Sequence, residues 1–202
     1  MRKKAAIFHG LGGSSKSFWI PWLKTQLEKH KFDVWTPSLI DCSDFDELDK
    51  WVEEVKNQTS CRNFDLMIGH SAGGPLILRL LSQSGFTAKH TVSVAGYIKP
   101  LHGTPPNDTT YPAGFCVDTI RANSRMLTFV HSDNDPWDCG HEQGEFMRKT
   151  LGGTLVVMSG EGHFGSESMK QPYVDFPLLL QHCLLEQDHE SGNIDCTPPN
   201  IG

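Results

Sequence analysis

The sequence has no long apolar run, no dense cluster of basic residues and no closely spaced pair of cysteines. No stretch approaches the roughly 20 consecutive apolar residues that a transmembrane helix needs. The basic segment 1–4 is followed by an apolar run, 5–8, that is too short for a signal peptide. We therefore expect a cytoplasmic protein that does not span a membrane.

Basic residues are in the minority. The 202 residues include 18 Lys and Arg against 24 Asp and Glu, which gives a formal net charge of −6. Much of this excess lies in the last stretch, 186–202, which has acidic residues but no Lys or Arg. The rest of the chain is nearly neutral and has no electrostatic footprint for nucleic acid or an anionic membrane. We expect a small-molecule partner, and a monomer or weak homodimer.

The cysteines show no Cys-x-x-Cys spacing, which argues against a structural zinc site. In a reducing compartment they are expected to be free thiols. They are Cys42, Cys61, Cys116, Cys139, Cys183 and Cys196.

Six short apolar runs alternate with segments of helical periodicity. The runs have the length and the β-branched or aromatic content of strands buried on both faces. They are Ala5–His9, Phe32–Trp35, Phe64–Gly69, Thr91–Ala95, Met126–His131 and Thr154–Met158. Helical spacing of apolar residues occurs within 18–27, 45–55, 76–81, 139–150 and 178–185. This alternation predicts a parallel sheet with helices on both faces, a three-layer α/β/α sandwich.

We expect one domain over residues 1–186 and a disordered tail over 187–202, where small and polar residues prevail. One connection breaks the alternation of strand and helix. From Gly96 to Ser124 the chain holds four prolines and few periodic apolar positions. A loop of this length in a compact domain is usually functional and often a lid. A plain surface excursion is the alternative.

The segment Gly69-His70-Ser71-Ala72-Gly73 matches the pattern Gly-x-Ser-x-Gly. An apolar run precedes it and an apolar helical segment follows, which is the strand–turn–helix context of a nucleophile elbow. The residues two before and two after the serine approach each other in such a turn, so both must be small. Ser71 is therefore the candidate nucleophile, and the helix that follows directs its partial positive charge toward the reacting bond.

A second glycine-rich segment, His9–Ser14, directly follows the first predicted strand. An oxyanion needs two N–H donors. The residue after the nucleophile, Ala72, supplies one, and a loop of this kind normally supplies the other, a role we assign to Leu11. The segment is also one residue short of a phosphate-binding P-loop, but Ser15 replaces its second glycine and Pro21 falls where its helix should continue. Nucleotide binding is the weaker interpretation.

A base and an acid complete such a site, in the chain order Ser, then Asp or Glu, then His. His163 lies in a glycine-flanked loop after the sixth predicted strand, a placement that the other histidines lack, and is the candidate base. The loop after the fifth predicted strand offers Asp133, Asp135 and Asp138. Asp135 directly precedes Pro136, which fixes the turn, whereas the other two fit solvated or capping roles better.

The same acidic loop could also be a metal site together with His131 and His141. It lacks the spacing and the glycine of an EF-hand. We therefore expect no metal and no other cofactor.

These motifs resemble the α/β-hydrolase fold, and within it the small serine hydrolases of the retinoblastoma-binding protein nine and YdeN type. The matching segments are His9–Ser14, Gly69–Gly74, Ser132–Pro136 and Gly162–Phe164. The resemblance implies a six-stranded, mostly parallel, doubly wound sheet in the strand order 2-1-3-4-5-6, and it carries the triad acid onto Asp135. Asn134 and the 96–124 excursion depart from the family pattern.

The residues together predict a serine hydrolase that cleaves small carboxylic esters through an acyl-enzyme, with Ser71, Asp135 and His163 as the triad. An amidase or aminopeptidase-like hydrolase needs the same residues, and a catalytically silent binding protein on this fold is a further alternative. The residues expected to contact substrate are Gly10, Gly12, His70, Trp137 and Phe164, with Tyr111 as a further part of the wall.

The length of the 96–124 excursion bears on substrate size. It is too short for a helical cap domain, and it shows no exposed apolar helical stripe of the kind that a lipase-like lid needs. The sequence therefore predicts a preference for short acyl groups.

Overall fold

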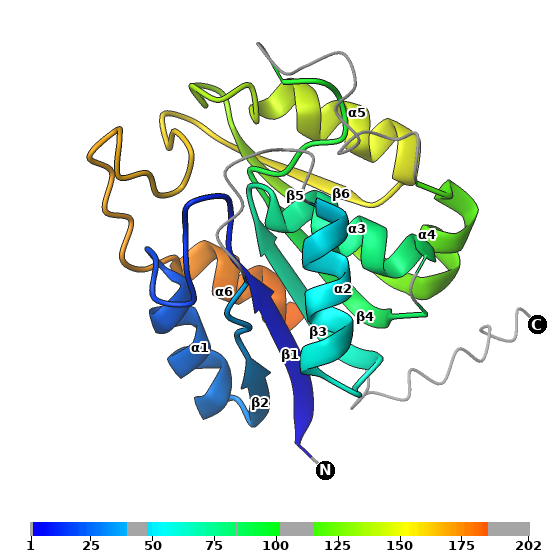
Figure 1. The fold of residues 1–202 in the computed structure, drawn as a ribbon. Helices are drawn as coiled ribbons and strands as arrows, with labels where there is room; N and C mark the ends of the chain where they lie inside the picture. The colour runs from blue at the N-terminus through cyan, green and yellow to red at the C-terminus, as the bar shows by residue number, and fades with distance from the viewer. Residues whose placement is uncertain (1, 40–47, 84, 102–114, 186–202) are drawn as a thin grey trace, which may run out of the picture.

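The computed structural model describes residues 2–39, 48–83, 85–101 and 115–185. Its centre is a six-stranded sheet in the order β2-β1-β3-β4-β5-β6, with every neighbouring pair parallel (Figure 1). The strands are β1 Lys3–Phe8, β2 Phe32–Trp35, β3 Asn63–His70, β4 Thr87–Val94, β5 Ser124–Ser132 and β6 Thr154–Met158. The predicted fold class is confirmed.

Six helices cover the two faces of the sheet, and each connection between strands is a crossover. The bounds are α1 Ile20–Lys29, α2 Leu48–Gln58, α3 Gly73–Gln83, α4 Val117–Asn123, α5 His141–Leu151 and α6 Pro177–Leu184. Helices α1 and α6 pack together on one face, while α2, α3, α4 and α5 form a continuous layer on the other (Figure 1). None of the described helices is long and apolar enough to cross a membrane.

The chain reverses its direction of travel across the sheet between β1 and β3. The connection after β1 leads outward to β2, and the connection after β3 leads the opposite way to β4. The two strands are in register at their carboxyl ends, where Phe8 pairs with Gly69. Ligands of doubly wound sheets bind at such a switch point, because the loops that follow the two strands diverge there and leave a crevice. Both glycine-rich motifs of the sequence follow these two strands.

The central strands are buried in the core, whereas the edge strand β6 is largely not. Ile7 in β1 and Ile68 in β3 are almost fully buried, as expected for strands with helices on both faces. In β6, by contrast, Thr154 is exposed and Val157 retains 49% of its accessible surface. The prediction of burial on both faces is wrong for β6 because this strand ends the sheet and has a neighbour on one side only.

The excursion between β4 and β5 contains more regular structure than predicted. Its last part forms the two-turn helix α4, whose Ile120 is fully buried. The guanidinium of Arg121 donates hydrogen bonds to the carbonyls of Thr150 and Leu151 at the end of α5, at 2.9 and 3.1 Å. The helix was missed because a single buried apolar side chain in seven residues gives no periodicity. Tyr111 and most of the prolines lie outside the described residues.

Within the described part of the chain, the four cysteines Cys61, Cys116, Cys139 and Cys183 are free, as predicted. Cys42 and Cys196 lie outside it.

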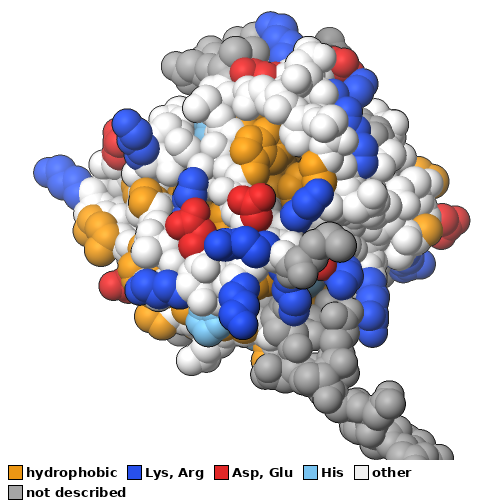
Figure 2. All heavy atoms as spheres, turned by 90° about the horizontal axis from the view of Figure 1, so that it is seen from below, with side chains coloured by type: hydrophobic (Ala, Val, Ile, Leu, Met, Phe, Trp, Pro, Cys, Tyr) orange, Lys and Arg blue, Asp and Glu red, His pale blue; other side chains and the backbone are white. Residues whose placement is uncertain are grey.

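The fold brings Lys89 and Arg125 beside the basic segment at the start of the chain. Figure 2 looks onto the amino ends of the strands, where Lys and Arg side chains surround a hollow of about 590 Å³. The charged residues that line it are Arg2, Lys3, Lys4, Asp65, Lys89 and Arg125. One of these cations is neutralised locally, because Lys89 Nζ lies 3.1 Å from the carboxylate of Asp65. This face is at the opposite end of the sheet from the glycine-rich motifs.

Candidate active site

Ser71 occupies a sharp turn between β3 and α3. Its backbone φ is +52°, in the left-handed region that non-glycine residues avoid at a cost of about 1–3 kcal/mol. Gly69 and Gly73 face each other across this turn, since a Cβ on Gly69 would overlap the carbonyl oxygen of Gly73. Any side chain there would force the turn open. Gly69 and Gly73 are thus the two small flanking residues that a nucleophile elbow requires, as the sequence predicted.

The loop after β1 lies directly against this serine. A Cβ on Gly10 would fall 2.8 Å from the Cβ of Ser71 and 3.3 Å from its Oγ. The loop is closed by a hydrogen bond from the Gly13 N–H to the Gly10 carbonyl, and the His9 ring donates from Nδ1 to the same carbonyl at 2.8 Å. Leu11 therefore sits at the tip of a fixed turn beside Ser71, where a backbone N–H can serve as an oxyanion donor.

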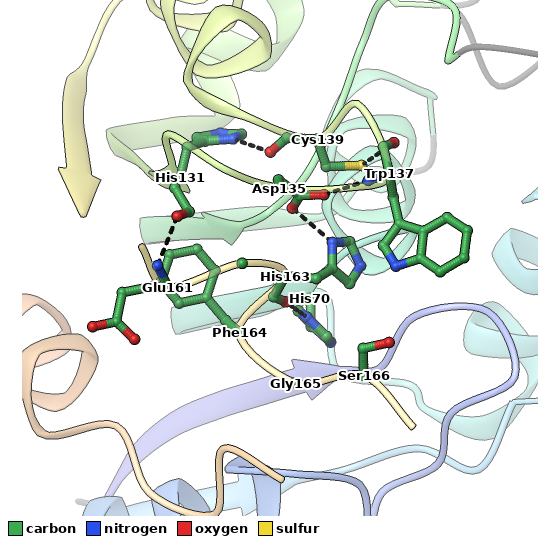
Figure 3. Close-up of polar contacts among 12 residues, drawn as sticks. His70, His131, Asp135, Trp137, Cys139, Glu161, His163, Phe164, Gly165 and Ser166 are labelled. Atoms are coloured by element: carbon green, nitrogen blue, oxygen red, sulfur yellow. Dashed lines mark hydrogen bonds and ion pairs between the residues drawn. The ribbon is translucent and has the colours of Figure 1, made fainter. Parts of the chain in front are cut away.

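His163 and Asp135 form the hydrogen-bonded pair that an acid–base mechanism requires (Figure 3). The imidazole donates from Nδ1 to Oδ2 of the carboxylate at 2.7 Å, which leaves the lone pair on Nε2. The other carboxylate oxygen accepts a 2.8 Å hydrogen bond from the Trp137 N–H. The carboxylate is fully shielded from solvent and the imidazole is nearly so. Such shielding strengthens the interaction between the two groups.

The loop after β5 carries Asp135 and is called the acid loop, and the loop after β6 carries His163 and is called the base loop. Hydrogen bonds join the two loops residue by residue. Three consecutive side chains, from the last residue of β5 onward, accept hydrogen bonds from backbone N–H groups after β6, and Asp135 follows them. Ser132 Oγ accepts from the Glu161 N–H at 3.0 Å, Asp133 Oδ1 from Gly160 at 2.8 Å and Asn134 Oδ1 from Gly162 at 2.7 Å. Asp133 is therefore a capping residue, in agreement with its predicted role, and its hydrogen bonds lower the pKa of its carboxyl.

The base loop is also held from behind by two buried aromatic side chains. His70 donates from Nε2 to the His163 carbonyl at 2.8 Å, and Trp19 donates from Nε1 to the Phe164 carbonyl at 3.0 Å. Burial, followed by the neighbouring His163, lowers the pKa of His70 to about 3. His70 is therefore neutral and carries its proton on Nε2, where the carbonyl requires a donor.

These groups open onto one pocket of about 700 Å³, which is within the usual range for small-molecule sites. Ser71 and His163 both line it. The predicted substrate contacts that also line it are Gly10, Gly12, His70 and Trp137, together with the predicted oxyanion donor Leu11. Trp137 is 47% exposed and stands at the wall of the pocket, whereas Ala72 is buried beneath the elbow.

Phe164 is not part of this pocket wall. Its ring is fully buried and stacks on Phe176, with 5.2 Å between ring centroids, and it meets Tyr173 edge-on. The prediction that Phe164 contacts substrate is replaced by a structural role, because its φ of +54° turns the side chain away from His163 and into the core. Among the described residues, the alternative metal site of His131 and His141 with the aspartates of the acidic loop is not brought together as a group of ligands.

Sequence reasoning missed several residues that hold the site. Gln171 binds the base loop twice, donating to the Glu161 carbonyl at 2.6 Å and accepting from the Gly165 N–H at 3.1 Å. Gln143, buried in α5, accepts from the N–H groups of Ile98 and Lys99 and so fixes the start of the excursion. Nothing in the local sequence distinguishes these glutamines from surface residues. Asn134 did stand out, as a departure from the family pattern, and its amide oxygen accepts from the Gly162 N–H, as a carboxylate oxygen also would.

Comparison with known proteins agrees with this geometry. The sequence model of the serine hydrolase family matches residues 5–181. The chain belongs to the serine hydrolase family. The match includes both glycine-rich motifs and both loops that carry Asp135 and His163. No curated protein sequence matches this serine hydrolase.

Solved structures show the same fold. The ydeN gene product from B. subtilis shares 19% identity with this serine hydrolase over 94% of its chain and 100% of the other, with a TM-score of 0.79. Est1E from Butyrivibrio proteoclasticus shares 16% over 93% and 89%, with a TM-score of 0.66. The esterase domain of a Rhodothermus marinus protein shares 17% over 85% and 82%, with a TM-score of 0.57. The resemblance to YdeN-type α/β-hydrolases is thereby confirmed.

Proposed function

We propose that this serine hydrolase cleaves small carboxylic esters through an acyl-enzyme intermediate. The observation that carries the proposal is the buried 2.7 Å pair of His163 and Asp135, which opens onto the same pocket as a serine held in a strained elbow. Strain of this kind persists only where the surrounding structure maintains it, and it is concentrated at functional sites.

The placement of the groups supports each step of the proposed reaction. His163 accepts the proton of Ser71 Oγ on Nε2 as the oxygen attacks the ester carbonyl. The N–H groups of Leu11 and Ala72 stabilise the oxyanion, and Asp135 stabilises the imidazolium and keeps its tautomer fixed. The imidazolium then protonates the leaving alcohol. Water, activated by the same base, hydrolyses the acyl-enzyme and restores the serine.

Esters are favoured over other acyl compounds by the structural neighbours. The Rhodothermus marinus domain is named as an esterase, and one Est1E structure has ferulic acid bound. The pocket of this chain is partly apolar, with Leu11, Leu101 and Trp137 in its wall. It offers room for a small acyl group beside Ser71.

Covalent labelling tests the nucleophile. A fluorophosphonate probe should label the wild-type protein and Ser168→Ala, which removes another serine of the pocket wall, but not Ser71→Ala. In p-nitrophenyl acetate hydrolysis, Ser71→Ala should lose roughly 10³-fold or more in turnover while its fold is retained. Near-normal turnover by purified Ser71→Ala would refute the mechanism. Absence of labelling in the wild-type protein would favour a silent binding protein.

A second candidate is the hydrolysis of aminoacyl esters or amides. It is favoured by the charge of the pocket wall, which includes the carboxylates of Asp138 and Glu167 but no Lys or Arg among its described residues. A protonated amine would be attracted there, and Trp137 could provide a cation–π contact. The p-nitrophenyl ester of alanine should be compared with that of butyrate. A higher kcat/KM for alanine that falls with added salt would support this candidate.

A further inference from the structure

The thiol of Cys139 lies beside the acid–base pair, and the proposed mechanism gives it no role. One ligand atom from each of Asp135, Cys139 and His163 can be chosen so that all three lie within 4.8 Å of one another. Two of them, Nδ1 and Oδ2, are already 2.7 Å apart. Cys139 is 1% exposed and His163 is 7% exposed, yet both border the pocket (Figure 3).

We propose that Asp135, Cys139 and His163 form a binding site for a thiophilic divalent cation, Zn²⁺ or Cd²⁺, and that its occupancy inhibits the enzyme. Imidazole nitrogen, thiolate sulfur and carboxylate oxygen are the three ligand types that zinc uses in proteins. Tetrahedral zinc with bond lengths of about 2.0–2.3 Å places its ligand atoms about 3.3–3.6 Å apart. Because the ligand atoms already lie within 4.8 Å of one another, side-chain rotations can bring them to these separations.

The backbone of the acid loop is already fixed at these ligands. The Cys139 carbonyl accepts a 2.8 Å hydrogen bond from His131, and Asp135 Oδ1 accepts one from the Trp137 N–H. The thiol itself makes only a 3.4 Å contact with the Trp137 carbonyl, which costs little to give up. Burial, and then the nearby Asp135, raise the pKa of the Cys139 thiol. The thiol is therefore protonated until a cation displaces its proton.

The bound cation would stop the proposed proton transfer. When Nδ1 of neutral His163 binds the metal, its proton moves to Nε2, and one proton is released from the Cys139 thiol. The ring then has no lone pair to accept the proton of Ser71, and its carboxylate partner is engaged by the metal. Cys139 and His163 line the pocket, from which a water molecule would complete the four ligands. Inhibition rests on the proposed function, whereas metal binding does not.

A spectroscopic titration tests the site on the full-length protein. Cd²⁺ bound by a thiolate gives a charge-transfer absorption in the ultraviolet. Wild type and Cys183→Ser, which removes another buried free thiol, should both develop this absorption at one equivalent. Cys139→Ser and Cys139→Ala should lose it, and both should bind Zn²⁺ at least about tenfold more weakly in calorimetry. Mg²⁺ and Ca²⁺, which prefer oxygen ligands, should not compete.

Activity provides the second measurement. At the same concentration of Zn²⁺, the turnover of p-nitrophenyl acetate should be inhibited at least about tenfold more strongly in wild type than in the Cys139 variants. The inference is overturned if wild type shows no thiolate absorption with Cd²⁺, or if the absorption persists in both Cys139 variants. It is also overturned if Zn²⁺ inhibits all variants equally. A wild type that binds Cd²⁺ through Cys139 but hydrolyses no ester would refute the proposed function and leave the metal site standing.

Discussion

His70 donates a hydrogen bond from Nε2 to the backbone carbonyl of His163, over 2.8 Å, and the two rings lie 5.1 Å apart. The residue before the nucleophile thus supports the loop that carries the base. Trp19 and Phe18 contact the His70 ring edge-on and keep it in place. Because burial lowers its pKa to about 3, His70 remains a neutral donor at neutral and mildly acidic pH.

Replacing His70 should impair the positioning of His163. We expect His70→Phe, which keeps the ring packing but loses the donor, to lower kcat by about 10–100-fold with little change in KM, since a displacement of about 1 Å can cost 10²-fold. His70→Gln, whose amide N–H reaches a similar position, should recover part of the loss. The matched control is His90→Gln, another buried histidine outside the pocket wall. Equal loss in His70→Phe and His70→Gln would indicate general disruption of packing.

The choice of acid can be tested within one loop. Asp135→Asn should lower kcat by about 10⁴-fold, because an amide at this position favours the wrong imidazole tautomer. Asp133→Asn keeps the oxygen that accepts from the Gly160 N–H, and its activity should remain within about tenfold of wild type. Steady-state kinetics on p-nitrophenyl acetate decide between them. The reverse ranking would assign the acid to Asp133.

The residues predicted the alternation of strands and helices and the elbow, and the family resemblance implied the sheet order that the structure confirms. The structure brings the predicted Asp135 and His163 together and places His163 and Ser71 in one pocket. Ser71 and His163 lie in glycine-flanked loops after buried strands, and local chain geometry is enough to place such residues at one edge of a parallel sheet. The position of Asp135 came from the family pattern and from Pro136. These features depend on residues that are close in sequence, which is why they could be recognised.

Contacts between distant segments could not be predicted in the same way. The role of Gln171 depends on a loop ten residues away folding back to the Glu161 carbonyl. Phe164 was expected in the pocket because it follows His163, but the left-handed backbone at this residue reverses its direction. The proximity of Cys139 to His163 likewise arises only when the loops after β5 and β6 are brought together.

Substrate length depends on what covers the pocket. The 96–124 excursion is too short for a helical cap domain that could enclose a long chain, so kcat/KM for p-nitrophenyl esters should be highest between acetate and butyrate. Trp137→Ala should shift this maximum toward longer chains by removing part of the wall. Phe146→Ala, an exposed aromatic outside the pocket wall, should leave the profile unchanged. A wild-type maximum at decanoate or beyond would contradict the assignment.

Buried histidines should make the protein sensitive to mild acid. Burial lowers the pKa of His90 to about 4 and that of His70 to about 3, against 6.5 in the unfolded chain. Between pH 6.5 and 5 the unfolded state therefore binds protons that the folded state does not. As the pH decreases through this window, the free energy of unfolding must therefore decrease, by up to about 1.4 kcal/mol per pH unit for each histidine.

Urea denaturation at pH 6.5 and at pH 5 measures this loss directly. His90→Gln, whose amide can still bond to the Thr128 hydroxyl, should lose about 2 kcal/mol less than wild type over the interval, because the variant has no imidazole to protonate. His141→Gln, which removes a largely solvent-accessible imidazole, should behave like wild type. Carboxyl groups such as that of Asp133, whose pKa is lowered, release their stabilisation only at lower pH, so they do not mask the effect. An unchanged difference between the two pH values in His90→Gln would show that His90 is not the group responsible.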